Sequence, residues 1–97
     1  MANWKLKCLG FEQLTSLSSA AGLTADTYKN ANRALIEADH TAGKYVRWRD
    51  DGTNPTATVG MTIAPGGQLW YDGDLSAIKL IEESASAKVN VTYYLEG

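Results

Sequence analysis

Polar and apolar side chains alternate along much of the chain, most strictly in residues 88–95. One side of this segment carries Val89, Val91, Tyr93 and Leu95, and the other carries Lys88, Asn90, Thr92 and Tyr94. Successive side chains of a β-strand point to opposite faces of its sheet, so a period of two predicts a strand with one buried face. Residues 88–95 are therefore predicted to form a strand that covers a core.

Further strands are predicted where the same period, or a short apolar run between turn residues, recurs. They are residues 4–8, a segment near Leu14, and residues 34–38, 44–49, 61–63, 69–71 and 77–81. With residues 88–95 they make about eight short strands separated by Gly, Asp and Pro turns. This spacing favours an all-β fold, a compact antiparallel sandwich or barrel, and a jelly-roll-like sandwich is the specific prediction.

The apolar side of each strand predicts the core. Cys8 shares the side of Trp4 and Leu6, so it is predicted to be a small buried hydrophobe, with a reactive thiol as the alternative. Met61 and Ile63 are both predicted to face inward. The remaining predicted core residues include Trp48, Ile78, Leu80 and Tyr93.

Residues 14–36 alternate less clearly. Residues 14–32 are rich in Ser, Thr, Ala and Asn, and Leu14, Leu17 and Leu23 are predicted to anchor them on the core as a short strand and a loop. Residues 26–36 also have helical propensity, so a helix is the alternative to a strand in that segment.

The composition fits one domain that spans residues 1–97. Apolar residues make up 44% and charged residues 21%, so disorder is not expected. The net charge of −2 gives no reason to expect a nucleic-acid partner. Cys8 is the only cysteine, which excludes an intramolecular disulfide. Neither a membrane helix of about 18 apolar residues nor a signal peptide is recognisable, so no membrane partner is expected.

Catalytic chemistry is not indicated, and the chain is predicted not to be an enzyme. His40 is the only histidine and is predicted to lie in a turn or loop, so neither a zinc site nor a cupin-like metal site is expected. No catalytic residue, cofactor or metal ligand is assigned. Residues 50–54 and 72–74 place carboxylates beside glycine, as calcium loops do, but their spacing favours tight turns.

The candidate binding residues are exposed aromatic and arginine side chains, the types enriched at binding hot spots. Tyr45, Trp70 and Tyr94 fall on the sides of their strands opposite the predicted core, and Arg47 and Arg49 share the side of Tyr45. These five residues form the predicted interface. The two arginines either pair with carboxylates of a neighbouring subunit or belong to a solvated charged face.

A distinctive series of segments occupies the second half of the chain. It consists of VRWRDDGTNPTA at residues 46–57, VGM at 59–61, YDGDL at 71–75, KLIE at 79–82 and VNVTYY at 89–94. The series resembles a family of small structural proteins of tailed bacteriophages and covers about residues 34–94. Some members of that family are similar to capsid decoration (cement) proteins with a jelly-roll-like fold, so the resemblance implies a virion protein.

The leading hypothesis is a head decoration protein that binds and stabilises the lattice of the major capsid protein. Its expected partners are that protein and further copies of itself, as a homodimer or homotrimer, because exposed strand edges pair and homo-oligomers close by symmetry. It is expected on the capsid surface of the virion after synthesis in the host cytoplasm. The alternatives are a minor tail, neck or head-spike protein and a carbohydrate-binding module that stacks sugars on Trp70 or Tyr94.

Overall fold

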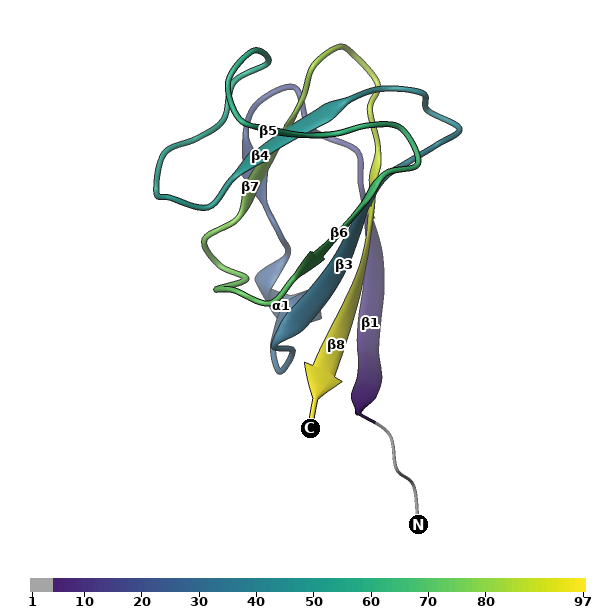
Figure 1. Cartoon of the computed structure of the whole chain (residues 1–97), viewed down its shortest axis with the longest axis vertical. Helices are drawn as coiled ribbons and strands as arrows, with labels where there is room; N and C mark the ends of the chain where they lie inside the picture. Colours follow the sequence, from purple (N-terminus) through teal and green to yellow (C-terminus); the bar gives the residue numbers. More distant parts are fainter. Residues whose placement is uncertain (1–4) are drawn as a thin grey trace.

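Eight short strands and one helical turn make up the chain in the computed structural model, which describes residues 5–97. The elements are β1 (Leu6–Leu14), β2 (Ala21–Gly22), α1 (Ala25–Tyr28), β3 (Arg33–Ala38), β4 (Val46–Arg49), β5 (Met61–Ile63), β6 (Gln68–Tyr71), β7 (Lys79–Glu82) and β8 (Val89–Glu96). Figure 1 shows β4, β5 and β7 at the upper end of the molecule, while β1, β3 and β8 occupy the lower part, with β8 ending near the C-terminus.

The strands form two antiparallel four-stranded sheets. Sheet I has the order β1-β8-β3-β6 and sheet II the order β2-β7-β4-β5. The pairs β1/β8, β2/β7, β3/β6 and β4/β5 are all antiparallel neighbours, as if one long hairpin had been rolled up. This order is that of a jelly roll, so the predicted all-β sandwich is confirmed.

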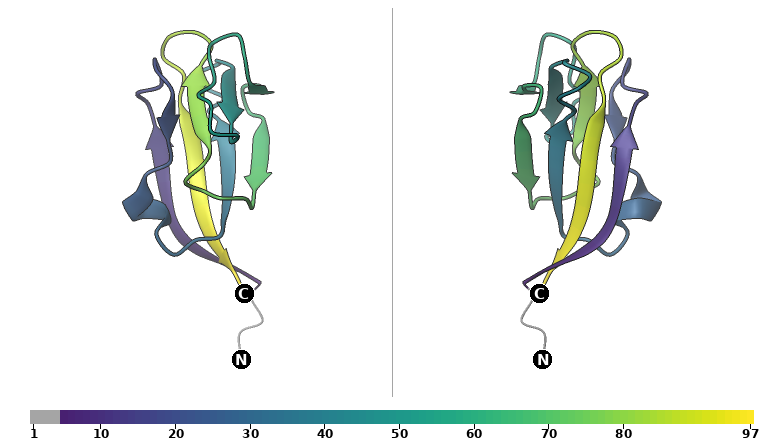
Figure 2. Two further views of the ribbon diagram at one scale, coloured as in Figure 1. Left: turned by 90° about the vertical axis from the view of Figure 1, so that its left-hand side faces the viewer. Right: turned by 90° about the vertical axis from the view of Figure 1, so that its right-hand side faces the viewer.

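Strand β8 lies inside sheet I, between β1 and β3, and Figure 2 shows it running beside β1 along the molecule. Val89, Val91 and Tyr93 are fully buried, which confirms the alternation predicted for this segment. The buried core comprises Leu17, Leu23, Ala34, Ile36, Ala38, Val46, Ile63, Tyr71, Leu75, Ile78, Leu80, Ala87, Val89, Val91 and Tyr93. Trp48, predicted to be a core residue, is partly buried and packs against this cluster.

The prediction for Cys8 is wrong, because its side chain is exposed. The register of β1 against β8 shifts between Cys8 and Gly10, which leaves Cys8 opposite the outward-facing Tyr94. Beyond the shift the inward positions of β1 are Gly10, opposite the buried Tyr93, and then Glu12, opposite the buried Val91. A bulge of this kind changes which residues of a strand point inward. Trp4, predicted on the same face, lies outside the described residues.

Met61 is also placed differently from the prediction. Ile63 is buried as expected, but Met61 is 62% exposed. Strand β5 is the edge strand of sheet II, and Met61 stands at its beginning, where it lines a surface hollow instead of the core. Met61 is therefore exposed because it lies on an edge strand, whereas the same position on an interior strand would be buried.

The N-terminal third is divided differently from the prediction. Residues 6–14 form one long strand, which replaces the two strands expected at residues 4–8 and near Leu14. The structure still has eight strands, because it also contains the two-residue β2, which was not predicted. Helix is confined to α1, and residues 34–38 belong to strand β3 as predicted. Leu17 and Leu23 are buried and Leu14 packs against the core, so their anchoring role is confirmed.

A buried tyrosine connects the core of sheet I to this irregular third. The Tyr93 hydroxyl donates a hydrogen bond to the Glu12 carboxylate, which also accepts bonds from the Thr24 amide at 3.1 Å and the Thr24 hydroxyl at 2.5 Å. Thr24 stands directly before α1, whose Tyr28 ring lies 6.0 Å from the Tyr93 ring. Burial, and then the bond to Glu12, raise the pKa of Tyr93 above its ordinary value.

We predict that Tyr93→Phe lowers the free energy of unfolding by about 2 kcal/mol, because it removes a hydrogen bond to a charged acceptor at a buried site. Tyr94→Phe is the matched control, since Tyr94 lies on the opposite face of the same strand. Tyr94→Phe removes a hydroxyl at the surface and is expected to lower the free energy of unfolding by less than about 0.5 kcal/mol. Urea unfolding of both variants measures the difference, and equal losses would contradict this role of Glu12.

Candidate functional site

The five predicted interface residues fall into two groups on different sheets. Arg47 and Arg49 lie on β4 of sheet II, and Tyr45, which is 50% exposed, directly precedes that strand. Trp70 on β6 and Tyr94 on β8 belong to sheet I. The fold therefore brings Trp70 and Tyr94 together but does not join them with the β4 group.

The aromatic pair on sheet I is held by an arginine that the sequence did not single out. The Trp70 and Tyr94 rings are 5.4 Å apart and tilted by 41°. The Arg33 guanidinium lies 4.8 Å from the centroid of Trp70 and also pairs with Glu96 at 3.5 Å. Trp70 nevertheless remains 46% exposed, so part of its surface is open to a ligand.

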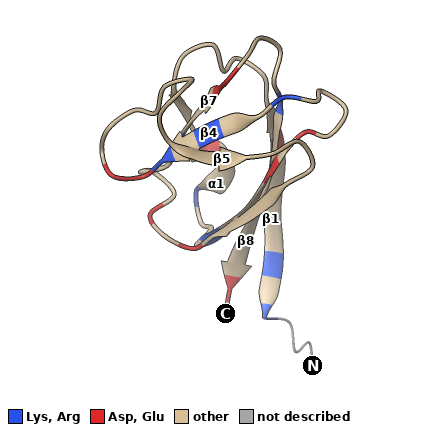
Figure 3. Ribbon diagram, turned by 45° about the horizontal axis from the view of Figure 1, so that its top comes forward, with Lys and Arg blue, Asp and Glu red and all other residues tan. Residues whose placement is uncertain are grey.

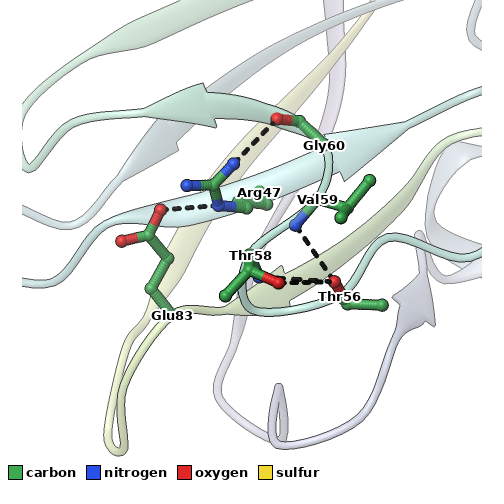
Figure 4. A network of polar contacts seen from close by, with 6 residues as sticks. All are labelled: Arg47, Thr56, Thr58, Val59, Gly60 and Glu83. Carbon is green, nitrogen blue, oxygen red and sulfur yellow. Dashed lines mark hydrogen bonds and ion pairs between the residues drawn. The ribbon is translucent and has the colours of Figure 1, made fainter.

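Arg47 is engaged within the chain. Its Nε donates to Glu83 at 2.7 Å and its Nη1 donates to the carbonyl of Gly60 at 3.1 Å (Figure 4). Gly60 has a φ of +144°, and a Cβ there would approach the Trp48 carbonyl to 3.1 Å, so glycine suits this close approach. Arg47 thereby ties the loop before β5 to β4 and to the segment after β7.

Arg49 also has a partner in the same chain. Its Nη2 lies 2.5 Å from Asp51, two residues further on, and this bond lowers the pKa of Asp51. Figure 3 shows the basic positions of β4 next to acidic positions in the adjoining loops. Both arginines are therefore neutralised locally, which leaves the aromatic and apolar side chains as the stronger candidates for contacts with another molecule.

The loop between β4 and β5 and the start of β5 enclose an apolar hollow of about 420 Å³, here called the edge hollow. Its lining residues are Trp48, Arg49, Asp50, Asp51, Val59, Gly60 and Met61. Val59 is 52% exposed. This surface was not predicted from the sequence, because the alternation of residues 61–63 placed Met61 in the core and Val59 had no predicted role.

A second surface lies on the outer face of sheet I, where four polar side chains occupy one cross-strand row. The row, here called the polar ladder, consists of Gln13, Asn90, Glu37 and Gln68. Gln13 donates to Asn90 at 2.8 Å, Asn90 donates to Glu37 at 3.1 Å, and Gln68 donates to Glu37 at 3.3 Å. The ladder joins residues from all four strands and is visible only once the cross-strand register is known.

The two acidic turns of the sequence are brought together by Tyr71. Its hydroxyl donates to Asp50 at 2.8 Å and to the carbonyl of Asp74 at 3.4 Å. Burial, and then the bond to Asp50, raise the pKa of Tyr71 to about 12. Within residues 5–97 no group of three or more His, Cys, Asp or Glu side chains is arranged to hold a metal ion. The Asp50 carboxylate thus holds the Tyr71 hydroxyl, and the Asp74 carboxylate accepts bonds from the amide and hydroxyl of Ser76.

Two further findings concern the class of the protein. In the described part of the chain, no helix has the length and apolar character needed to cross a bilayer. The strand order defines the chain as an eight-stranded jelly-roll sandwich. Comparison of the chain with protein-family models, curated proteins and solved structures found no match.

We predict that folding stability falls as the pH rises from about 10, the ordinary pKa of tyrosine, towards about 12, the pKa of Tyr71 in the folded chain. Over this range the unfolded chain loses the proton that the folded chain retains. Urea unfolding across this range measures the slope. In Tyr71→Phe the free energy of unfolding should fall less steeply over this pH range, because the titrating hydroxyl is gone. An unchanged slope in this variant would contradict the raised pKa of Tyr71.

We predict that Arg47→Met lowers the free energy of unfolding by about 1 kcal/mol, because both Glu83 and the Gly60 carbonyl lose their donor. Amide hydrogen exchange should also become faster in residues 56–60. Arg49→Met is the matched control on the same strand. It should leave the free energy of unfolding almost unchanged, because Arg49 pairs with Asp51 in the adjacent turn and an exposed ion pair contributes little. Equal effects of the two substitutions would contradict the structural role of Arg47.

Proposed function

We propose that this chain is a structural protein of a tailed-bacteriophage virion that decorates the head by binding the major capsid protein. The proposal combines the sequence resemblance with the properties of one surface. Residues 46–61, which contain the longest part of that resemblance, form β4, the following loop and the first residue of β5. They also supply every residue that lines the edge hollow.

The observation that carries the proposal is this apolar hollow at the unpaired edge of sheet II. Met61 and Val59 are each more than half exposed beside the partly buried Trp48. Exposed apolar side chains next to an unpaired strand edge are suited to a contact with another chain, because the edge offers unpaired backbone groups and the side chains offer apolar surface. An apolar side chain of the capsid protein that enters the hollow would bury Met61 and Val59.

A contact of this kind is sufficient for a protein that works by repetition. At about 25 cal/mol per Å² of apolar surface, a few hundred Å² contributes several kcal/mol before the costs of association. Many copies, each bound across a boundary between capsid subunits, oppose separation of those subunits. No cofactor is needed, because the mechanism consists only of added contact area.

The proposed assembly includes contacts between copies of this chain, as a homodimer or a homotrimer. Symmetric oligomers match the two-fold and three-fold positions of a capsid lattice. Strands β1 and β6 are the edges of sheet I, and β2 and β5 are the edges of sheet II. With the edge hollow beside β5 assigned to the capsid, β1 and β2 are the edges proposed for contacts between copies.

We predict that purified virions of the phage that encodes this chain contain about one copy per major capsid subunit, or a simple fraction such as about one third, as lattice symmetry requires. Quantitative mass spectrometry of the particles measures this ratio. A few to tens of copies would instead support the second candidate, a minor tail, neck or head-spike protein. Absence of the chain from particles would overturn the virion assignment.

The surface is tested with neighbouring residues of β5 that receive the same charge. Met61→Lys places an ammonium group in the edge hollow and should weaken binding to capsids that lack the chain by at least about tenfold. Thr62→Lys makes the same change at the next residue, which does not line the hollow. Equal binding by the two variants in a capsid co-sedimentation assay would exclude the edge hollow as the contact.

A further inference from the structure

The outer face of sheet I contains a shallow trough of about 330 Å³ that the decoration function does not use. Its lining residues are Phe11, Leu35, Glu37, Gln68, Asn90 and Thr92. Leu35 and Thr92 lie opposite each other on the two central strands and form the floor. Phe11, on the edge strand β1, is 60% exposed and forms one wall.

The trough has an aromatic row and a polar row side by side. Along the first row, Phe11, Thr92, Leu35 and Trp70 are successive cross-strand partners from β1 to β6. The polar ladder is the next outward-facing row, two residues further along each strand. Three steps between strands of about 4.8 Å make each row about 14 Å long, the length of a short oligosaccharide.

The hydrogen bonds of the polar ladder fix its groups in place before a ligand arrives. Asn90 accepts from Gln13 and donates to both Glu37 and Asp39, the latter at 3.0 Å. Amide and carboxylate groups held in one line can bond the adjacent hydroxyls of a sugar ring, since each hydroxyl both donates and accepts. Groups held in advance bind at a smaller entropy cost.

From this geometry we propose that the trough is a binding site for a neutral oligosaccharide of pyranose rings. The C–H face of a pyranose is apolar and packs on the Phe11 ring in the trough, or on Trp70 at the β6 end of the same row beyond the trough, while its hydroxyls reach the polar ladder. The site is concave and combines the apolar Phe11 and Leu35 with oriented polar groups, and small-ligand sites likewise combine apolar surface with a few placed polar groups. The inference is independent of the proposed virion function.

Charge decides between neutral and anionic sugars. Among the lining residues Glu37 is an acid and none is basic. Asp39 stands behind Asn90, and its hydrogen bonds to Asn90 and to the Ala42 amide lower its pKa, so it stays ionised at neutral pH. The Arg33 guanidinium is engaged by Trp70 and Glu96. An anionic glycan would therefore be repelled.

Charge also argues against a protein surface as the occupant. An apolar protein patch laid over the ladder would remove the Glu37 carboxylate from water and leave it with the neutral amide donors of Asn90 and Gln68, which is costly for a charged group. Sugar hydroxyls supply donors to that carboxylate and still present a C–H face to Phe11. The ladder therefore fits a polyhydroxylated ligand better than the apolar contact proposed for the edge hollow.

The test uses the full chain labelled with ¹⁵N and four separate probes: maltohexaose, cellohexaose, mannohexaose and chitohexaose. Binding of at least one probe should shift the side-chain amide resonances of Gln13, Gln68 and Asn90 and the indole resonance of Trp70. The indole of Trp48 on sheet II is the internal control and should not shift. Absence of these shifts with all four probes at millimolar concentration, or shifts confined to Trp48, would overturn the proposal.

Variants of Phe11 distinguish stacking from general hydrophobicity. Phe11 is exposed, so its replacement leaves the core intact, and the spread of amide resonances verifies the fold. Phe11→Leu should weaken binding of the best probe at least about tenfold, whereas Phe11→Tyr keeps the ring and should retain binding. Tyr45→Ala removes an exposed aromatic from outside the trough and should have no effect. Equal affinities of Phe11→Leu and the unmodified chain would overturn the site.

Discussion

The buried hydroxyl of Tyr93 is the constraint on which the arrangement of this chain depends. A tyrosine that is fully inside a core must give its hydroxyl a partner, because an unpaired buried donor is costly. Glu12 supplies the acceptor only because the register of β1 shifts after Cys8, which brings Glu12 onto the inward side. The same carboxylate accepts two bonds from Thr24. One polar group thus fixes the register of an edge strand and the position of α1 against it.

The inward alternation of β8 also determines what lies on the outside of sheet I. Once Val91 and Tyr93 point into the core, Asn90, Thr92 and Tyr94 must point outward. Because β1 and β3 pair with β8 on either side, their outward residues fall into rows with these three. The polar ladder and the contact of Tyr94 with Trp70 are therefore consequences of the core, and a surface built on paired strands is held more rigidly than one built on loops.

The alternation located strands both inside the sheets and at their edges, but on the edge strands β1 and β5 it gave the wrong direction for Cys8 and Met61. Strands β3, β7 and β8 followed from alternation because burial enforces a strict period of two. Cys8 was misplaced because a bulge leaves no clear signal in the sequence, and Met61 because the alternation does not reveal which strand is at an edge. The polar ladder requires the register of residues 13, 37, 68 and 90, which are far apart in the chain. Tyr45 and Trp70 were correctly predicted to be exposed, whereas the partners of Arg47 and Arg49 depend on how loops fold.

A smaller hollow shares residues with both the edge hollow and the trough, and this determines how the two proposed activities would combine. Gln68 lines the trough and also a smaller hollow of about 270 Å³ that contains Met61, so a partner docked against β5 approaches one end of the ladder. Phe11 lies on β1 at the opposite edge of sheet I. Contact with the capsid through the edge hollow alone would therefore leave the β1 end of the trough facing solvent, whereas a second copy paired with β1 would border it. Binding of a sugar at Phe11 and binding of a capsid at Met61 are compatible, while a ligand long enough to extend past Gln68 would compete with the capsid contact.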